Sequence, residues 1–335
     1  MLIRVREGPE SATPRRVNGI EISRRYYLDE VAPRLNGVPH AAALLGNGSE
    51  VLGYDDEVSP DHDFGPRVQI FYPEERGMDG ETVRAFFSAR LGFDPGKGVC
   101  VEDWLLTPTQ ILAGLTRGAI FHDPNGELAH YRAALHWYPD DVWRYALAAG
   151  WLKVGQEEAF VGRTGSTGDD LGSRIVTARL ARELIRLAFL VERRWAPYSK
   201  WLGRAFTELK VAAEMGPPLS AALSAADWRE RERLICTAGS VLATATNELG
   251  LCPPVDPAPR RFHERDIRVL DAERFTVALT GAITDPEVRA VLTRVGLRQG
   301  TIGRLPGTVD QAVDSTDVLT DPARFRAAAP MLGLG

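Results

Sequence analysis

The chain has 335 residues, of which 44% are hydrophobic, and these values are typical of a soluble protein with two modest domains. Its formal net charge of −5 argues against a long DNA or RNA partner, because proteins that hold such polymers need a basic surface. The three cysteines lie far apart without metal-ligand spacing, which indicates reduced thiols.

The N-terminal residues lack the apolar core of a signal peptide, and no segment is long and apolar enough to span a bilayer. We therefore expect a cytoplasmic protein with no membrane partner. The expected assembly is a monomer or a homodimer.

The first part of the chain mixes helical and strand patterns. Apolar spacing and turn residues define each element, and Gly37 and Gly92 follow two of the helices as stop signals. The predicted elements are a helix over 20–35, a buried strand over 41–45, a second strand over 67–72 and a helix over 81–91.

Long helical patterns dominate from Thr107 onward. Thr107-Pro108-Thr109-Gln110 is a good helix start, with an early proline and a threonine cap. Prolines at 197, 217, 218, 253 and 254 punctuate these patterns. The predicted helices cover about 108–117, 126–136, 139–153, 170–195, 199–214 and 226–249.

Together these elements predict an α+β fold. A small domain with a mixed sheet and helices comes first, and a mainly helical bundle domain follows it. The expected boundaries are 18–104 for the first domain, 105–256 for the helical domain and 257–335 for a helical or irregular C-terminal extension.

Two carboxylates separated by one residue form the most informative pattern of the chain. Alternate residues of a strand project from the same face, so Asp61 and Asp63 at a strand edge would direct both carboxylates to one point. Mg²⁺ prefers oxygen ligands and is usually held by one or two carboxylates plus substrate phosphates. We expect Mg²⁺ to bind here, whereas His62 projects from the opposite face and is expected to pack or face solvent.

A glycine-serine turn precedes these aspartates and follows the strand predicted over 41–45. Gly46 and Gly48 would let the backbone approach a ligand closely, and Ser49 offers a hydroxyl group to a phosphate oxygen. Such a turn is often only a turn, and Asp-x-Asp is common in solvated loops. Their order along the chain is what makes the pair informative.

Strand, glycine-serine turn, Asp-x-Asp and second strand, in this order, resemble the nucleotidyltransferase superfamily of the polymerase-β type. The resemblance implies that the turn holds a nucleoside triphosphate and that Asp61 and Asp63 bind metal ions. An acceptor hydroxyl group then attacks the α-phosphorus and pyrophosphate leaves, with two metal ions on the attacking and leaving oxygens.

Further segments are similar to one bacterial family of uncharacterised nucleotidyltransferase-like proteins, which pair such a domain with a helical C-terminal domain of unknown function. The similarity extends from about Asn18 to Asp317. The segments that carry it are 137–145, 156–163, 186–194, 196–201 and 307–317.

The chain departs from that family between residues 73 and 81, where family members have a longer segment with a further strand. In the superfamily a third carboxylate on a neighbouring strand completes the metal site or acts as the base. Asp79 is the closest counterpart by position, followed by Glu81 and then by Glu102 or Asp103. If Asp79 is a plain turn residue, the protein would bind nucleotide without turnover.

The helical domain supplies two further groups of candidates. Glu157 or Glu158 would act as a general base if partial burial raised its pKa, and the alternative is a solvated helix surface. Arg163 would neutralise triphosphate charge, and the alternative is a residue beside a glycine-rich loop.

Tyr198 and Lys200 follow Pro197 in the first turn of a predicted helix, where the helix terminus favours anions. By resemblance to antibiotic-modifying transferases, Lys200 would contact the β- and γ-phosphates. The alternative is a lysine that covers Trp201 with its aliphatic chain.

The sequence thus predicts a Mg²⁺-dependent nucleotidyltransferase that uses a nucleoside triphosphate, ATP by expectation, and a small-molecule acceptor. Two alternatives from other classes stay open. One is a nucleotide-binding regulator without turnover, and the other is an antitoxin-like transferase that modifies a protein.

Overall fold

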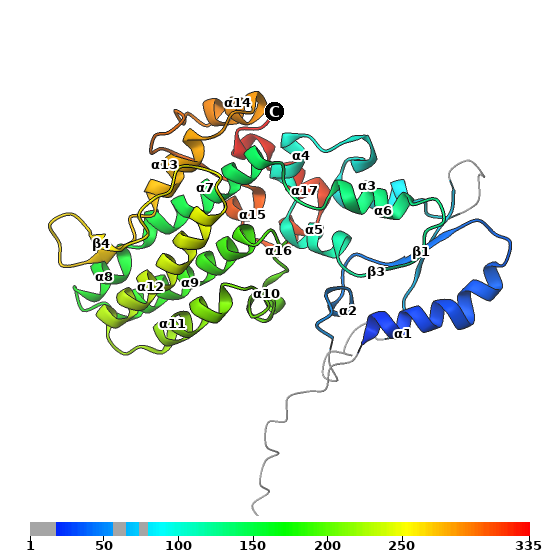
Figure 1. Ribbon diagram of the computed structural model, residues 1–335, viewed down its shortest axis with the longest axis horizontal. Coiled ribbons are helices and arrows are strands. Elements are labelled where there is room, and N and C mark those ends of the chain that lie inside the picture. The colour runs from blue at the N-terminus through cyan, green and yellow to red at the C-terminus, as the bar shows by residue number, and fades with distance from the viewer. Residues whose placement is uncertain (1–17, 56–64, 74–79) are drawn as a thin grey trace, which may run out of the picture. The chain divides into compact units, whose positions relative to one another are not determined.

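A computed structural model of the protein describes residues 18–55, 65–73 and 80–335 (Figure 1). The described residues group into two compact units. The sheet unit is the described part of Met1–Val83 with Arg117–Ala129, and the helical unit is Arg84–Thr116 with His130–Gly335. A small antiparallel sheet in one unit and a helical bundle in the other confirm the expected α+β class. The domain boundaries inferred from the sequence stay a prediction.

The sheet unit is organised around a short central strand. β1 (Ala41–Leu44) lies between β2 (Gln69–Phe71) and β3 (Ala119–His122), and both pairings are antiparallel. All four residues of β1 are buried, as the apolar run in the sequence predicts. β3 was not predicted, and it joins the sheet from far along the chain.

A single continuous helical path precedes β1. It comprises α1 (Gly19–Tyr26), a π-helical turn (Tyr27–Val31) and a 3₁₀ turn (Ala32–Leu35), and it ends before Gly37 at φ +77°. The predicted helix over 20–35 is therefore right in extent. Its first turn is capped by the Asn18 side chain, which accepts a hydrogen bond from the Glu21 N–H.

Gly118 packs against the end of the central strand. Its φ is +74°, and a Cβ atom there would collide with the carbonyl oxygen of Leu44. Gly37 shares nearly the same φ, but a Cβ atom at that position would have nothing within 4 Å. Alanine substitutions at the two glycines therefore separate the energetic cost of a positive φ from the cost of the collision with β1.

We expect Gly37→Ala to lower the free energy of unfolding of the sheet unit by about 1–2 kcal/mol, which is the cost of a left-handed alanine. Gly118→Ala should cost about 1–3 kcal/mol more, because the added methyl group displaces the Leu44 carbonyl. Urea unfolding of the two variants and the parent measures this difference. Equal costs would contradict the close packing of Gly118 on β1.

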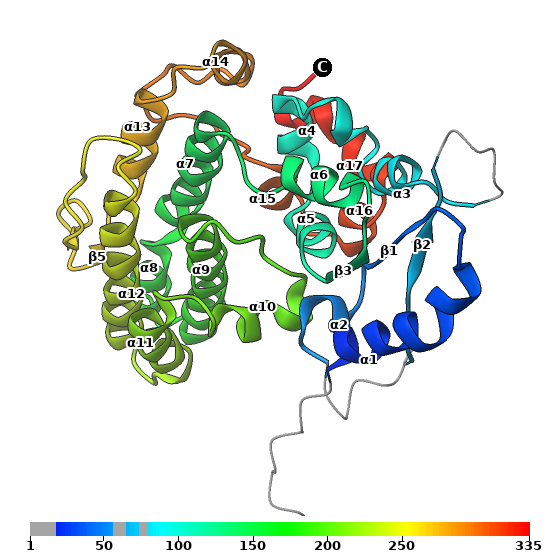
Figure 2. The same ribbon diagram turned by 45° about the vertical axis from the view of Figure 1, so that its right-hand side comes forward.

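The helical unit is built on long helices that lie side by side (Figures 1 and 2). Its core includes the stacked rings of Trp151 and Phe275, whose centroids lie 4.6 Å apart, and the fully buried Trp143. These tryptophans pack in the core. The helices of this bundle are α7 (Asp140–Glu157), α9 (Asp170–Val191), α11 (Ala212–Ser224), α12 (Trp228–Glu248) and α13 (Glu273–Gly281).

The other described elements have nine residues or fewer. Within the ranges that the structure describes, no helix is both long and apolar enough to cross a membrane. The elements are α2 (Ser49–Leu52), α3 (Val83–Leu91), a 3₁₀ turn (Pro95–Lys97), α4 (Val101–Leu106), α5 (Thr109–Thr116), α6 (Glu127–Ala134), α8 (Phe160–Gly165), α10 (Ser199–Phe206), β4 (Arg260–Arg261), β5 (Arg268–Val269), α14 (Pro286–Arg294), α15 (Val309–Ala312), α16 (Thr316–Leu319), α17 (Pro322–Arg326) and a 3₁₀ turn (Ala329–Leu332).

Three helix predictions in this unit were wrong. The segment predicted as one helix over 199–214 contains α10, which ends at Phe206, and the start of α11 at Ala212. α9 ends at Val191 rather than at 195, because Arg193 adopts a positive φ of 53°. Pro217 and Pro218 do not interrupt a helix but lie inside α11. Met215, Leu219 and Ala222 form the buried face of α11, so packing offsets the hydrogen bonds that the prolines cannot donate.

Candidate functional site

The glycine-serine turn begins where β1 ends, and a side chain from β2 fixes this point. The Leu45 N–H donates to Gln69 Oε1 at 2.9 Å, and Gln69 Nε2 donates to the Leu45 carbonyl at 2.8 Å. The Gln69 amide thus replaces a further pair of strand-to-strand hydrogen bonds. The backbone that enters the turn is held at a defined position.

The turn itself requires glycine and is braced by an arginine. Gly46 and Gly48 have φ values of +91° and +142°, and Ser49 starts α2. Arg67 Nη2 donates to the Asn47 carbonyl at 2.5 Å and lies 2.6 Å from a Glu50 carboxylate oxygen. The turn is visible in the sequence, whereas the support from Arg67 and Gln69 is not, because it depends on the pairing of β1 with β2.

The predicted metal ligands Asp61 and Asp63 and the third carboxylate Asp79 lie outside the described residues, so these assignments stay predictions. Within the described ranges, no group of three or more His, Cys, Asp or Glu side chains is placed to hold a metal ion. Asp103, a remoter candidate for the third carboxylate, belongs to α4, and its carboxylate lies 3.0 Å from Arg326 Nη2.

Glu158 is buried and serves the backbone of a distant segment. Its carboxylate accepts hydrogen bonds from the N–H groups of Leu270 at 2.6 Å, Asp271 at 3.2 Å and Ala272 at 2.9 Å, just before α13. Its neighbour Glu157 instead pairs with Arg179 at 2.9 Å. These contacts occupy both carboxylates that the sequence offered as general bases.

The other candidates of the helical unit contact aromatic rings. The Arg163 guanidinium lies 5.2 Å from the centroid of the Phe160 ring, and the Lys200 ammonium lies 4.9 Å from that of Trp201. Tyr198 is the N-cap residue of α10, so Lys200 does lie in a first helical turn. Glu158 contacts the backbone before α13, Arg163 lies over Phe160 and Lys200 lies over Trp201, so the contacts of these three candidates do not join them in one site.

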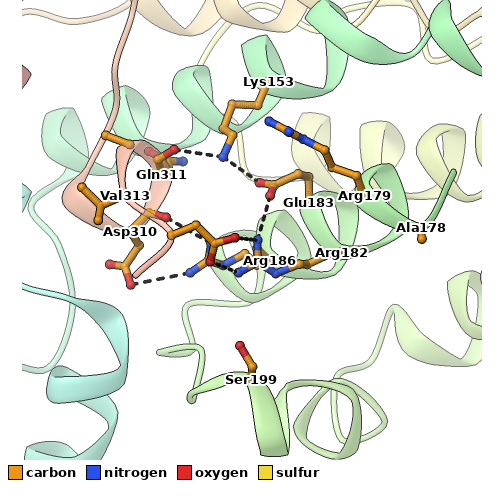
Figure 3. A pocket seen from close by; sticks show the side chains of 12 residues that line it. Lys153, Ala178, Arg179, Arg182, Glu183, Arg186, Ser199, Asp310, Gln311 and Val313 are labelled. Atoms are coloured by element: carbon orange, nitrogen blue, oxygen red, sulfur yellow. Dashed lines mark hydrogen bonds and ion pairs between the residues drawn. The ribbon is translucent and has the colours of Figure 1, made fainter. Parts of the chain in front are cut away.

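A cavity of the helical unit lies between α7, α9 and the segment around α15, and its volume is about 650 Å³ (Figure 3). We call it the arginine pocket. Its lining includes residues from two segments, 186–194 and 307–317, to which the sequence assigned no chemical role. The charged side chains that line it are Lys153, Arg179, Arg182, Glu183, Arg186, Asp310 and Asp314.

One signal in the sequence points to this pocket. Arg179, Arg182 and Arg186 follow an i, i+3, i+7 spacing, which places them on one face of a helix. The acidic partner of Arg182, Asp314, is 132 residues away from it, and no local pattern predicts that pairing. The sequence therefore indicates the arginine face, and only the fold shows the other side of the pocket.

Two buried carboxyl groups lie near the β4–β5 hairpin. Desolvation raises the pKa of Glu158 from its ordinary value of 4.5 to about 7, although three backbone N–H groups act to lower it. Desolvation likewise raises the pKa of Glu232 to about 7, against a backbone hydrogen bond from Arg268. The folded protein therefore binds protons more tightly at both groups than the unfolded chain does.

The free energy of unfolding should consequently fall as the pH rises from about 4.5 to about 7 and level off above that. Glu232→Gln removes one of the titrating groups, so thermal unfolding between about pH 5 and pH 8 should show a smaller decline. Glu230→Gln is the control, because the Glu230 side chain is 46% exposed on the same helix and Arg233 lowers its pKa. A decline unchanged in Glu232→Gln would contradict this assignment.

A family model matches part of the chain. Residues 104–202 match the family model described as "Domain of unknown function (DUF4037)". The matched segment includes α7 and α9, and therefore Lys153, Arg182 and Arg186 of the arginine pocket. No curated protein matches the chain.

Proposed function

We propose that the protein is a Mg²⁺-dependent nucleotidyltransferase that moves a nucleoside monophosphate from a triphosphate to a hydroxyl group of a small molecule. The observation that supports this proposal best is the turn after β1. A buried central strand leads into two positive-φ glycines and Ser49, and Gln69 and Arg67 brace this backbone from the next strand region. Asp61 and Asp63 lie between α2 and β2 in the sequence.

The proposed roles divide between phosphate, metal and acceptor. Gly48 and Ser49 would contact the triphosphate, because a glycine backbone allows close approach and the serine hydroxyl donates to a phosphate oxygen. Asp61 and Asp63 would hold Mg²⁺, which when bound supplies charge neutralisation to the triphosphate. The role expected of Lys200 at the phosphates stays a prediction, because Lys200 belongs to the helical unit and its ammonium lies over the Trp201 ring.

The general base is proposed to be Asp79 rather than Glu158. A base must reach the acceptor hydroxyl group within hydrogen-bond distance. The Glu158 carboxylate already accepts three backbone hydrogen bonds, and breaking them would leave buried donors without partners. Its raised pKa therefore reflects a structural position in the helical unit.

The proposal is tested by incubating the protein with Mg²⁺ and each α-labelled nucleoside triphosphate, together with a cell extract fractionated by size. Pyrophosphate release and transfer of label to a small molecule are the expected results. Asp61→Ala and Asp63→Ala should each abolish both signals, and Ser49→Ala should reduce the rate about ten-fold through loss of a hydrogen bond to a charged group.

Ser224→Ala is the matched control, because Ser224 is an exposed serine at the end of α11 that bonds only to its own helix. Its rate should equal that of the parent protein. Pyrophosphate release that survives both aspartate substitutions would refute the site. Nucleotide binding without release would favour the regulator, and label on a macromolecule would favour the protein-modifying transferase.

A further inference from the structure

The arginine pocket carries several cations on two adjacent helices. Arg179, Arg182 and Arg186 lie along one face of α9, and Lys153 comes from α7 (Figure 3). The lining also includes three acidic residues, so the formal charge of the charged lining is 4 − 3 = +1. A cavity of about 650 Å³ falls within the range of small-molecule sites, roughly 300–1,000 Å³.

The inner side of the pocket is fixed by buried partners. Lys153 Nζ donates to the Gln311 carbonyl at 2.9 Å and lies 3.3 Å from the buried Glu183 carboxylate. Arg186 Nη1 donates to the Asp310 carbonyl at 3.0 Å. These contacts join α7 and α9 to α15 and hold two of the cations in place.

Arg182 differs, because its bidentate partner is exposed, although its Nη1 also lies 3.6 Å from the buried Glu183 carboxylate. Its two terminal nitrogens donate to the two oxygens of Asp314 at 2.7 and 3.3 Å, which is a bidentate pairing. The Asp314 side chain is 76% exposed, whereas that of Arg182 is 31% exposed. A carboxylate so exposed is held weakly, since water competes for it and screens the pair.

The electrostatic potential at the Asp314 carboxylate is positive. Desolvation acts to raise the pKa of Asp314, but its hydrogen bond to Arg182 and the charges of Arg182, Arg186 and Lys153 together lower it. The same position is therefore favourable for another anion. A guanidinium group matches the oxygens of a phosphate bidentately, as it matches those of a carboxylate.

We propose that the arginine pocket binds a small phosphate-bearing molecule, and that its phosphate takes the place of the Asp314 carboxylate on Arg182. Arg179 lies at the same helical face with a 58% exposed side chain and pairs with Glu157 at 2.9 Å, so a second phosphate oxygen would share this guanidinium with that carboxylate. Asp314 thus competes with the ligand from within the chain. This proposal does not rest on nucleotidyl transfer.

Calorimetric titration with inorganic phosphate and with pyrophosphate tests the proposal. Divalent cations are omitted, and sodium chloride keeps the ionic strength constant, so that binding does not report the proposed metal site. Arg182→Gln should weaken binding about ten-fold or more, because it removes a bidentate charged donor. Asp314→Asn should tighten binding about two- to five-fold, because the competing ion pair is lost.

Arg174→Gln is the matched control, since Arg174 lies on α9 outside the pocket and pairs with Asp170 at 2.7 Å. It should bind phosphate as the parent protein does. Circular dichroism checks that Arg182→Gln is folded, and Asp314→Asn tests the site independently of that variant.

Unchanged affinity in a folded Arg182→Gln, or weaker affinity in Asp314→Asn, would overturn the proposal. Malonate, a small dicarboxylate, serves as the competing anion. Binding of malonate as tight as that of pyrophosphate would overturn the preference for phosphate. Comparison of phosphate with pyrophosphate then shows whether one or two phosphate groups are held.

Discussion

One buried carboxylate joins the parts of the helical unit. Asp310 on α15 accepts hydrogen bonds from the Thr109 N–H at 2.8 Å and from its hydroxyl group at 3.3 Å, at the start of α5. Burial raises the pKa of Asp310, and Arg186 beside it acts against that shift. Because a buried charge is costly without partners, the positions of α5, α9 and α15 depend on one another.

Carboxylates at both ends of α7 likewise accept backbone hydrogen bonds from distant segments. Asp141 in its first turn accepts hydrogen bonds from the N–H groups of Thr284 and Asp285, and Glu158 just beyond its end binds the backbone before α13. Both carboxylates satisfy N–H groups that would otherwise lack partners in loops. The two ends of α7 therefore hold the two ends of the segment that contains α13.

Local patterns predicted much of the fold. The burial of β1 and the periodicity of α7 and α12 follow from neighbouring residues, so the sequence shows them. β3 could not be predicted in this way, because its four residues gain a partner only when β1 pairs with them. The helix through Pro217 and Pro218 is another case in which tertiary packing overrides local preference.

Some features of the candidate sites could likewise be predicted from local sequence, and others could not. The glycine-serine turn is visible in the sequence because glycine is required where φ is positive, and its position after a strand is local information. The carboxylate contacts of Glu158 and the Arg182–Asp314 pair join residues more than a hundred positions apart. A raised pKa at Glu158 was expected to indicate a general base. The pKa is raised, and the buried carboxylate accepts hydrogen bonds that hold the backbone before α13.

The contact between Thr109 and Asp310 spans 201 residues, and it has a consequence for the chain during synthesis. Residues of the sheet unit extend no further than Ala129, so that unit can assemble early on the ribosome. The start of α5 must wait for its acceptor until Asp310 has left the ribosome. The helical unit is therefore expected to complete its folding late and to expose apolar helix faces to chaperones until then.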